Sequence, residues 1–150
     1  MTRLTEHVTT ALGRDVAFRH VSDFSRQAEW DPNTVSSRRI DQGELGVGAR
    51  FALDVKMGRG AVPMEYRITE FEPPSKVVLV GEGSGVWSRD VITFTEVPEG
   101  TRVDYVADIE LSGLLGLVQP LLGRTLAAVG RGAAAGMKSE LDRLASADVA

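Results

Sequence analysis

Apolar and polar residues alternate along the middle of this chain. Every second residue is apolar through 51–57, 62–69 and 102–111. Because successive side chains of a strand point to opposite faces, this period predicts strands with one buried and one wet face. Short turns rich in Gly and Pro separate these segments, and no helix-length segment lies between them. We therefore expect an antiparallel meander.

The first thirty residues predict a strand followed by two short helices. Residues 4–12 carry apolar side chains on one face of the strand, and a glycine follows. Asp15 can cap the first helix, and Asp23 or Ser25 the second, because their side-chain oxygens accept backbone N–H groups of the first turn. The second helix must end just before Pro32, which disfavours the α conformation in the preceding residue.

The last third of the chain has a helical period. Apolar residues recur every three or four positions from Leu114 to Leu144, which predicts a regular helix from about Pro120 to Ala145. Gly130, Gly132 and Gly136 interrupt it, and each costs up to ~1 kcal/mol relative to Ala. Either a thin helix face leaves room for sheet side chains or a ligand, or the helix packs closely on the sheet without one.

A single helix with much Ala and Gly cannot fill the concave face of a strongly curved sheet. Either large sheet side chains fill this space or an internal cavity remains. We expect the apolar face of the helix to pack against the concave face. The candidates to line the cavity and contact a ligand are Trp30, Phe51, Leu53, Met64, Tyr66, Ile68, Asp90, Ile92, Tyr105, Leu122 and Leu126.

Four local motifs, in this order, carry a family resemblance. They are Phe18–Ser25 with Glu29–Pro32, Gly46–Phe51, Tyr66–Pro74 and Gly100–Tyr105. Over roughly residues 3 to 145 the chain resembles the START/polyketide-cyclase superfamily. The resemblance implies an α+β helix-grip fold: a curved antiparallel sheet of about seven strands around a long C-terminal helix, with two short helices after the first strand.

The same resemblance implies a hydrophobic pocket for lipids, polyketides, hormones or similar small molecules. None of the four motifs is catalytic in that family, so the resemblance transfers no active-site residue. The length of 150 residues suits one domain, which we expect to span 1–150.

Composition excludes several classes of function. The chain has no cysteine, which removes disulfides, thiol nucleophiles and thiolate metal sites. Its net charge is −4 without a basic patch, so we expect no nucleic-acid partner. Gly, Pro or Arg interrupts every apolar stretch before the ~20 residues of a membrane span, and no secretory signal is evident, so we expect a cytoplasmic protein. Nothing in the sequence indicates the oligomeric state.

The sequence offers no metal or cofactor site. The two histidines, His7 and His20, are not at ligand spacing, and we expect His20 on an exposed helix face. The glycine-rich segment 81–85 lacks the Lys-Ser or Lys-Thr of a phosphate loop, and a strand follows it. We therefore expect no metal and no cofactor.

Asp90 is the one weak candidate for a catalytic residue. If Ile92 and Phe94 face inward, then Ser88 and Asp90 share that face. A buried, unpaired carboxyl would have a raised pKa and could act as an acid or base. The alternative, which we favour, is an arginine partner such as Arg89 or a bulge that turns Asp90 outward, because buried Asp is rare unless paired.

Tyr66 and Tyr105 lie on apolar strand faces, where their hydroxyls could bond a ligand carbonyl or simply a backbone carbonyl. Three functions stay open. The first is a non-enzymatic binding or carrier protein for an apolar small molecule, and we lean toward it. The second is a cyclase, dehydratase or hydrolase that uses Asp90 with one or both tyrosines. The third is a regulatory module with a vestigial cavity.

Overall fold

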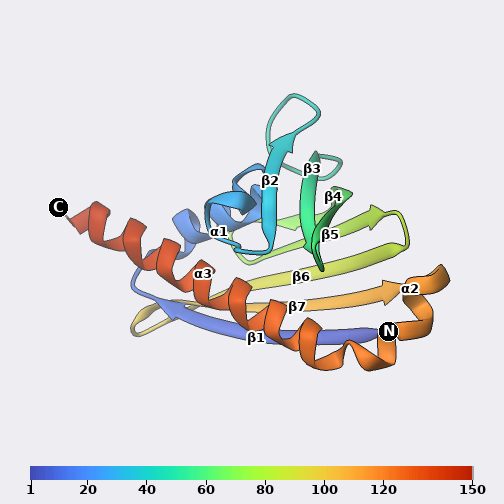
Figure 1. The fold of residues 1–150 in the computed structure, drawn as a ribbon. Coiled ribbons are helices and arrows are strands. Elements are labelled where there is room, and N and C mark those ends of the chain that lie inside the picture. Colours follow the sequence, from blue (N-terminus) through green and yellow to red (C-terminus); the bar gives the residue numbers. More distant parts are fainter. Residues whose placement is uncertain (150) are drawn as a thin grey trace.

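Seven antiparallel strands form one curved sheet, and a long C-terminal helix crosses its concave face (Figure 1). The computed structural model describes residues 1–149. With η for a 3-10 helix, the elements are β1 (Thr2–Thr10), α1 (Arg14–Ser22), η1 (Phe24–Glu29), β2 (Thr34–Arg39), β3 (Arg50–Met57), β4 (Gly60–Glu72), β5 (Lys76–Gly83), β6 (Val86–Val97), β7 (Gly100–Leu111), α2 (Gly113–Val118), η2 (Gln119–Leu121) and α3 (Gly123–Val149).

The strands follow the order β1-β7-β6-β5-β4-β3-β2. Strands β2 to β7 pair with their neighbours in the chain, as expected for a meander, and β1 closes the far edge against β7. The segment α1–η1 carries the chain from one edge strand to the other. The predicted α+β helix-grip architecture is therefore confirmed. The first strand spans 2–10 rather than 4–12, because Leu12 already lies in the bend before α1.

The two short helices begin differently from each other. Gly13 occupies the N-cap of α1 without a side-chain cap, so the predicted cap at Asp15 is wrong and that residue lies in the first turn. Asp23 caps η1 as predicted, because its Oδ1 accepts a hydrogen bond from the Ser25 backbone N–H at 3.1 Å. The helix η1 ends at Glu29, before Pro32, as the proline rule requires.

The long C-terminal helix begins three residues after its predicted start at about Pro120, and two short helical segments precede it. Pro120 lies in η2, and α3 begins only at Gly123. The break coincides with Gln119, whose side chain binds the end of β7 and so holds the preceding turns away from the axis of α3. Within residues 1–149, no single helix is long and apolar enough to cross a membrane. The pair 113–121 and 123–147 passes that test only jointly, by length and composition, and is bent by 87°.

The glycines of α3 serve close packing and the cavity at once. A side chain at Gly136 would overlap the Trp30 backbone carbonyl, so the helix approaches that turn more closely than alanine permits. A Cβ added at Gly130 would contact only Leu4 and Glu6, and its shortest distance to either would be an ordinary 3.5 Å. Gly130 also lines the cavity. Each of the two explanations therefore applies at a different position.

Aromatic side chains fill the part of the core beneath α1 and η1. The ring of Phe18 lies 5.2 Å, between centroids, from the rings of both Phe71 and Phe94. Phe24 lies 6.2 Å from Phe51 on β3. We call this region the filled end of the core. Its fully buried side chains are Phe18, Phe24, Phe51, Ile68, Val77, Leu79 and Ile92.

Candidate functional site

A cavity of about 680 Å³ lies between α3 and the concave face of the sheet. This volume is within the range of pockets that hold small molecules. We call this region the hollow end of the core. Its apolar wall includes Leu4, Val8, Leu53, Val55, Met64, Val103, Ala107, Ile109, Leu111, Leu122, Leu126, Val129, Ala133 and Met137.

The mouth of the cavity lies between the β3–β4 hairpin and the start of α3. Four of the five wall residues that are exposed to solvent identify it: Lys56 and Gly58 on the hairpin, and Val118 and Thr125 on the helical side; the fifth, His7, lies on β1. A ligand would therefore enter between these two segments.

Asp90 forms the centre of a polar cluster on the cavity wall. Its side chain enters from β6 and is only 5% exposed. The Ser88 hydroxyl donates to Asp90 Oδ1 at 2.5 Å, and the Tyr105 hydroxyl on β7 donates to Oδ2. Tyr66, from β4, also lines the cavity next to this group. The cluster places one carboxyl and three hydroxyls in an otherwise apolar space.

Burial sets the protonation states of this cluster. Burial raises the pKa of Asp90 to about 6, while the hydrogen bonds from Ser88 and Tyr105 oppose this rise. Burial also raises the pKa of Tyr105 well above its usual value, and the nearby charge of Asp90 adds to the effect. The pKa of Tyr66 rises for the same two reasons. Near neutral pH both phenols keep their protons, and Asp90 alone titrates.

The arginine partner that we favoured for Asp90 is wrong. Arg89 lies on the opposite face of β6, where its Nη2 donates to Glu70 Oε2 at 3.5 Å. Strand alternation causes this, since residues 89 and 90 must point to opposite faces. Asp90 is compensated by hydroxyl donors, not by a charge. The conditional expectation that Ser88 and Asp90 face inward together with Ile92 is met, because all three are buried.

A second polar group reaches the cavity from η1 and β2. Asp31 accepts hydrogen bonds from Thr34 Oγ1 at 3.1 Å, from the Asn33 backbone N–H at 2.9 Å and from Gln27 Nε2 at 3.3 Å. Gln27 Oε1 is buried and has no hydrogen-bond partner among the described residues. A ligand donor would satisfy it. Sequence reasoning missed these residues, although the Asp31-Pro32 turn was a signal that a polar loop begins here.

The structure divides the predicted ligand-contacting residues into two groups. Those on the cavity wall are Leu53, Met64, Tyr66, Asp90, Tyr105, Leu122 and Leu126. Those away from the wall, in the filled end or beside it, are Trp30, Phe51, Ile68 and Ile92. The second group faces inward, as its period requires, but lies where aromatic side chains leave no space.

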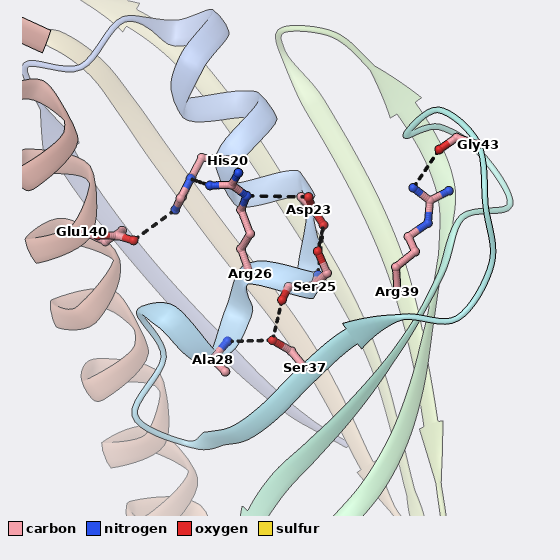
Figure 2. Close-up of polar contacts among 9 residues, drawn as sticks. All are labelled: His20, Asp23, Ser25, Arg26, Ala28, Ser37, Arg39, Gly43 and Glu140. Carbon is pink, nitrogen blue, oxygen red and sulfur yellow. Dashed lines mark hydrogen bonds and ion pairs between the residues drawn. The ribbon is translucent and has the colours of Figure 1, made fainter.

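His20 is buried between α1 and α3, so the expected exposed position is wrong (Figure 2). Its Nε2 lies 3.3 Å from Glu140 Oε2, and its Nδ1 lies 3.2 Å from Arg26 Nη1. Because Arg26 can only donate, Nδ1 is the acceptor and the ring proton is on Nε2. Burial, followed by the charge of Arg26, lowers the pKa of His20, so the ring is neutral near pH 7.

The network around His20 is structural and does not reach the cavity wall. Ser37 on β2 donates to the Ser25 carbonyl at 2.8 Å and accepts from the Ala28 N–H at 3.0 Å, which holds η1 against the sheet (Figure 2). Within residues 1–149, no group of three or more His, Asp or Glu side chains could hold a metal ion.

Residues 1–147 match the family model described as polyketide cyclase/dehydrase and lipid transport. A START superfamily protein from Mycobacterium smegmatis has a similar structure, with a TM-score of 0.80 and 13% identity over 96% of this chain and 99% of that one. The structure of the Zhui aromatase/cyclase from Streptomyces sp. R1128 has a TM-score of 0.77 and 14% sequence identity, and the match covers 94% of this chain and 93% of that one. The structure of a protein from Thermus thermophilus has a TM-score of 0.78 and 14% sequence identity, and the match covers 93% of this chain and 96% of that one. No curated protein sequence matches this chain.

Proposed function

The chain belongs to the polyketide cyclase/dehydrase and lipid transport family, and from this premise we propose that it binds and carries a hydrophobic small molecule in its cavity. The observation that carries the proposal is the cavity of about 680 Å³ with a mostly apolar wall. Transfer of apolar surface out of water drives binding in such a space, and a few polar groups orient the ligand.

The polar groups of the wall define the ligand further. An apolar body contacts the wall residues predicted from the sequence, among them Leu53, Met64 and Leu126. A polar substituent meets the cluster around Asp90. A hydroxyl or amine on the ligand donates a hydrogen bond to the buried Gln27 Oε1. Without such a donor, burial of this oxygen has a desolvation penalty that no hydrogen bond offsets. We therefore propose a lipid or polyketide-like molecule with at least one hydrogen-bond donor.

Titration with a hydrophobic fluorophore tests the proposal. We expect saturable binding with a simple stoichiometry, in competition with a fatty acid or a flat aromatic compound. Leu126→Trp places a large ring in the cavity and should abolish binding, whereas Ala128→Trp on the exposed face of the same helix should not. Absence of saturable binding to the folded wild-type protein, or equal binding to both variants, contradicts the proposal.

Native mass spectrometry of the purified protein, followed by extraction of copurifying molecules, identifies the ligand. We expect a mass increment that disappears in Leu126→Trp and remains in Ala128→Trp. An extracted compound without a hydrogen-bond donor would contradict the assignment of a ligand group to Gln27.

Asp90 favours a second candidate function, a cyclase or dehydratase that acts on the bound molecule. A buried carboxyl with a pKa of about 6 exchanges its proton near neutral pH, as a general acid or base must. Tyr105 donates a hydrogen bond to Asp90 Oδ2 and so holds the carboxyl in place without giving up its own proton. Asp90→Asn separates the two functions, because a carrier should keep its affinity across pH 4–9 while an enzyme should lose turnover of its extracted ligand. The open cavity gives no support to the third function, a regulatory module with a filled core.

A further inference from the structure

The short segment α2–η2 presents an apolar surface beside the cavity mouth. Leu114 is 84% exposed, Leu117 77% and Leu121 81%, and Val118 adjoins them. We call these four residues the apolar tip. No residue of α2 is buried, and the sequence holds no charged residue between Glu110 and Arg124. Large apolar side chains grouped in this way on a surface mark a contact with a partner.

Hydrogen bonds of one side chain hold the apolar tip outward. Gln119 is buried, and its Oε1 accepts from the Leu111 N–H at 3.1 Å. Its Nε2 donates to the Ile109 carbonyl and to Thr2 Oγ1, both at 2.9 Å. The segment is therefore fixed to the ends of β7 and β1. Leu114, Leu117 and Leu121 stay in solvent, although the adjacent cavity, which Leu115 of the same segment lines, offers apolar space.

Cations lie around the same mouth. Lys56 on the β3–β4 hairpin lines the cavity, Arg59 lies in the turn of that hairpin beside Gly58, and Arg124 lies at the start of α3 beside Thr125, which also lines the cavity. All three are exposed, and none takes part in an ion pair found among residues 1–149. These cations are therefore free to bind anionic groups, although the whole chain has a net charge of −4.

We propose that the apolar tip inserts into an anionic lipid bilayer surface, with Lys56, Arg59 and Arg124 against the headgroups and the cavity mouth facing the lipid. Stable peripheral binding needs two signals, apolar insertion and basic residues, and both are present here. The bend of 87° between 113–121 and 123–147 fits a segment that dips into the interface while α3 stays on the sheet.

A bilayer fits this surface better than a second copy of the chain does. A standard protein interface uses about 20–30 residues a side, whereas the apolar tip has four. A bilayer requires no complementary shape, so a few protruding leucines suffice. The cations around the tip would repel one another across a symmetric dimer, while anionic headgroups neutralise them.

Vesicle flotation tests the docking surface. We expect wild-type protein to float with phosphatidylcholine vesicles that contain phosphatidylglycerol, and to float less with phosphatidylcholine alone. Leu117→Ser with Leu121→Ser should lower the partition coefficient about tenfold or more. The matched control, Val47→Ser, removes an exposed apolar side chain from a different loop and should have no effect.

A second pair of variants tests the charges. Lys56→Glu with Arg59→Glu should abolish the preference for phosphatidylglycerol, and high salt should weaken wild-type binding in the same way. Arg38→Glu is the control, at an exposed arginine on β2 for which residues 1–149 supply no ion-pair partner, and it should retain most of that preference. Equal losses in control and test variants would refute the specific surface.

Two further outcomes would overturn the proposal: no flotation of wild-type protein with either vesicle, or a dimer in solution that the Leu117→Ser, Leu121→Ser variant dissociates. Because all substituted side chains are exposed, the variants should keep the thermal midpoint of the wild type. Fluorophore binding to the Leu117→Ser, Leu121→Ser variant, whose substituted residues do not line the cavity, reports on the cavity independently, so failure of docking and failure of ligand binding can be told apart.

Discussion

The filled and hollow ends of the core lie on the same concave face, yet only one contains space. Beneath α1 and η1, Phe18 and Phe24 project onto the sheet and meet its aromatic side chains. Beneath the first half of α3, the helix offers Ala133, Gly130 and half-buried Leu126 instead. The sheet is continuous across both ends. The size of the side chains on the covering helix therefore decides whether a cavity forms.

The polar groups lie at the boundary between the two ends. The ring of Tyr66 lies 5.2 Å from that of Phe24 in the filled end, while Tyr66 also lines the cavity. On β6, Asp90 lies two residues before the fully buried Ile92 and Ser88 lies four residues before it, so all three side chains are on the same face. A rigid aromatic base thus positions the groups that could act on a ligand, which is the support that a functional cluster needs.

Phe18→Ala should have the largest effect on stability among the changes that probe this comparison. Its ring is fully buried between two aromatic partners, so truncation leaves a closed cavity in the filled end. We expect a loss of about 3–5 kcal/mol in the free energy of unfolding, measured by urea denaturation. A loss below about 1 kcal/mol would mean that the filled end is loosely packed and that the comparison fails.

The alternating strands, the Asp23 cap and the α3 stripe could be predicted because each depends on neighbours in the chain. Periodicity also placed Asp90 on the inner face. It named Tyr66 and Tyr105 as possible partners of Asp90 but could not choose between them, because the β6–β7 register brings Tyr105 to Asp90 from fifteen residues apart. Periodicity also could not show that Phe51 lies in the filled end of the core whereas Leu53 lines the cavity. That distinction depends on which helix covers each one, a long-range property.

Asp90→Asn tests the polar boundary through the pH dependence of stability. The folded pKa of about 6 exceeds the unfolded value of about 3.9, so the proton is bound more tightly in the folded state. The stabilisation from this group is complete below about pH 4 and is lost as the pH rises through about 6. We expect the loss to reach about 3 kcal/mol, and the variant to lack it.

Urea denaturation of both proteins at pH 4 and pH 7 measures this prediction, because the contributions of other titrating groups cancel in the difference. Between pH 4 and pH 7 the wild type should lose about 3 kcal/mol more of its free energy of unfolding than the variant does. If the difference between the two proteins is the same at both pH values, Asp90 is not desolvated and the enzyme hypothesis loses its acid.

Gly136→Ala should destabilise the close contact between α3 and the turn at Trp30. The new methyl group would meet the Trp30 carbonyl, which is backbone and cannot move aside without shifting the turn. We expect a loss of about 1–3 kcal/mol by thermal or urea unfolding. Gly130→Ala is the matched control in the hollow end, where space exists, and it should gain up to about 1 kcal/mol from helix propensity. Effects of the same sign at both positions would contradict this placement of α3.

Leu126→Ala should have the smallest effect on stability, in contrast to Phe18→Ala in the filled end. A fully buried leucine would cost about 2–5 kcal/mol on truncation, but Leu126 is only half-buried and already borders open space. The deletion enlarges an existing cavity instead of creating a sealed one, so only part of the transfer free energy is lost. We expect about 1 kcal/mol. Fluorophore affinity should change more than stability does, because the removed methyl groups face the ligand. A loss above about 3 kcal/mol would show that this part of α3 packs as a closed core, and the hollow end would then not exist in solution.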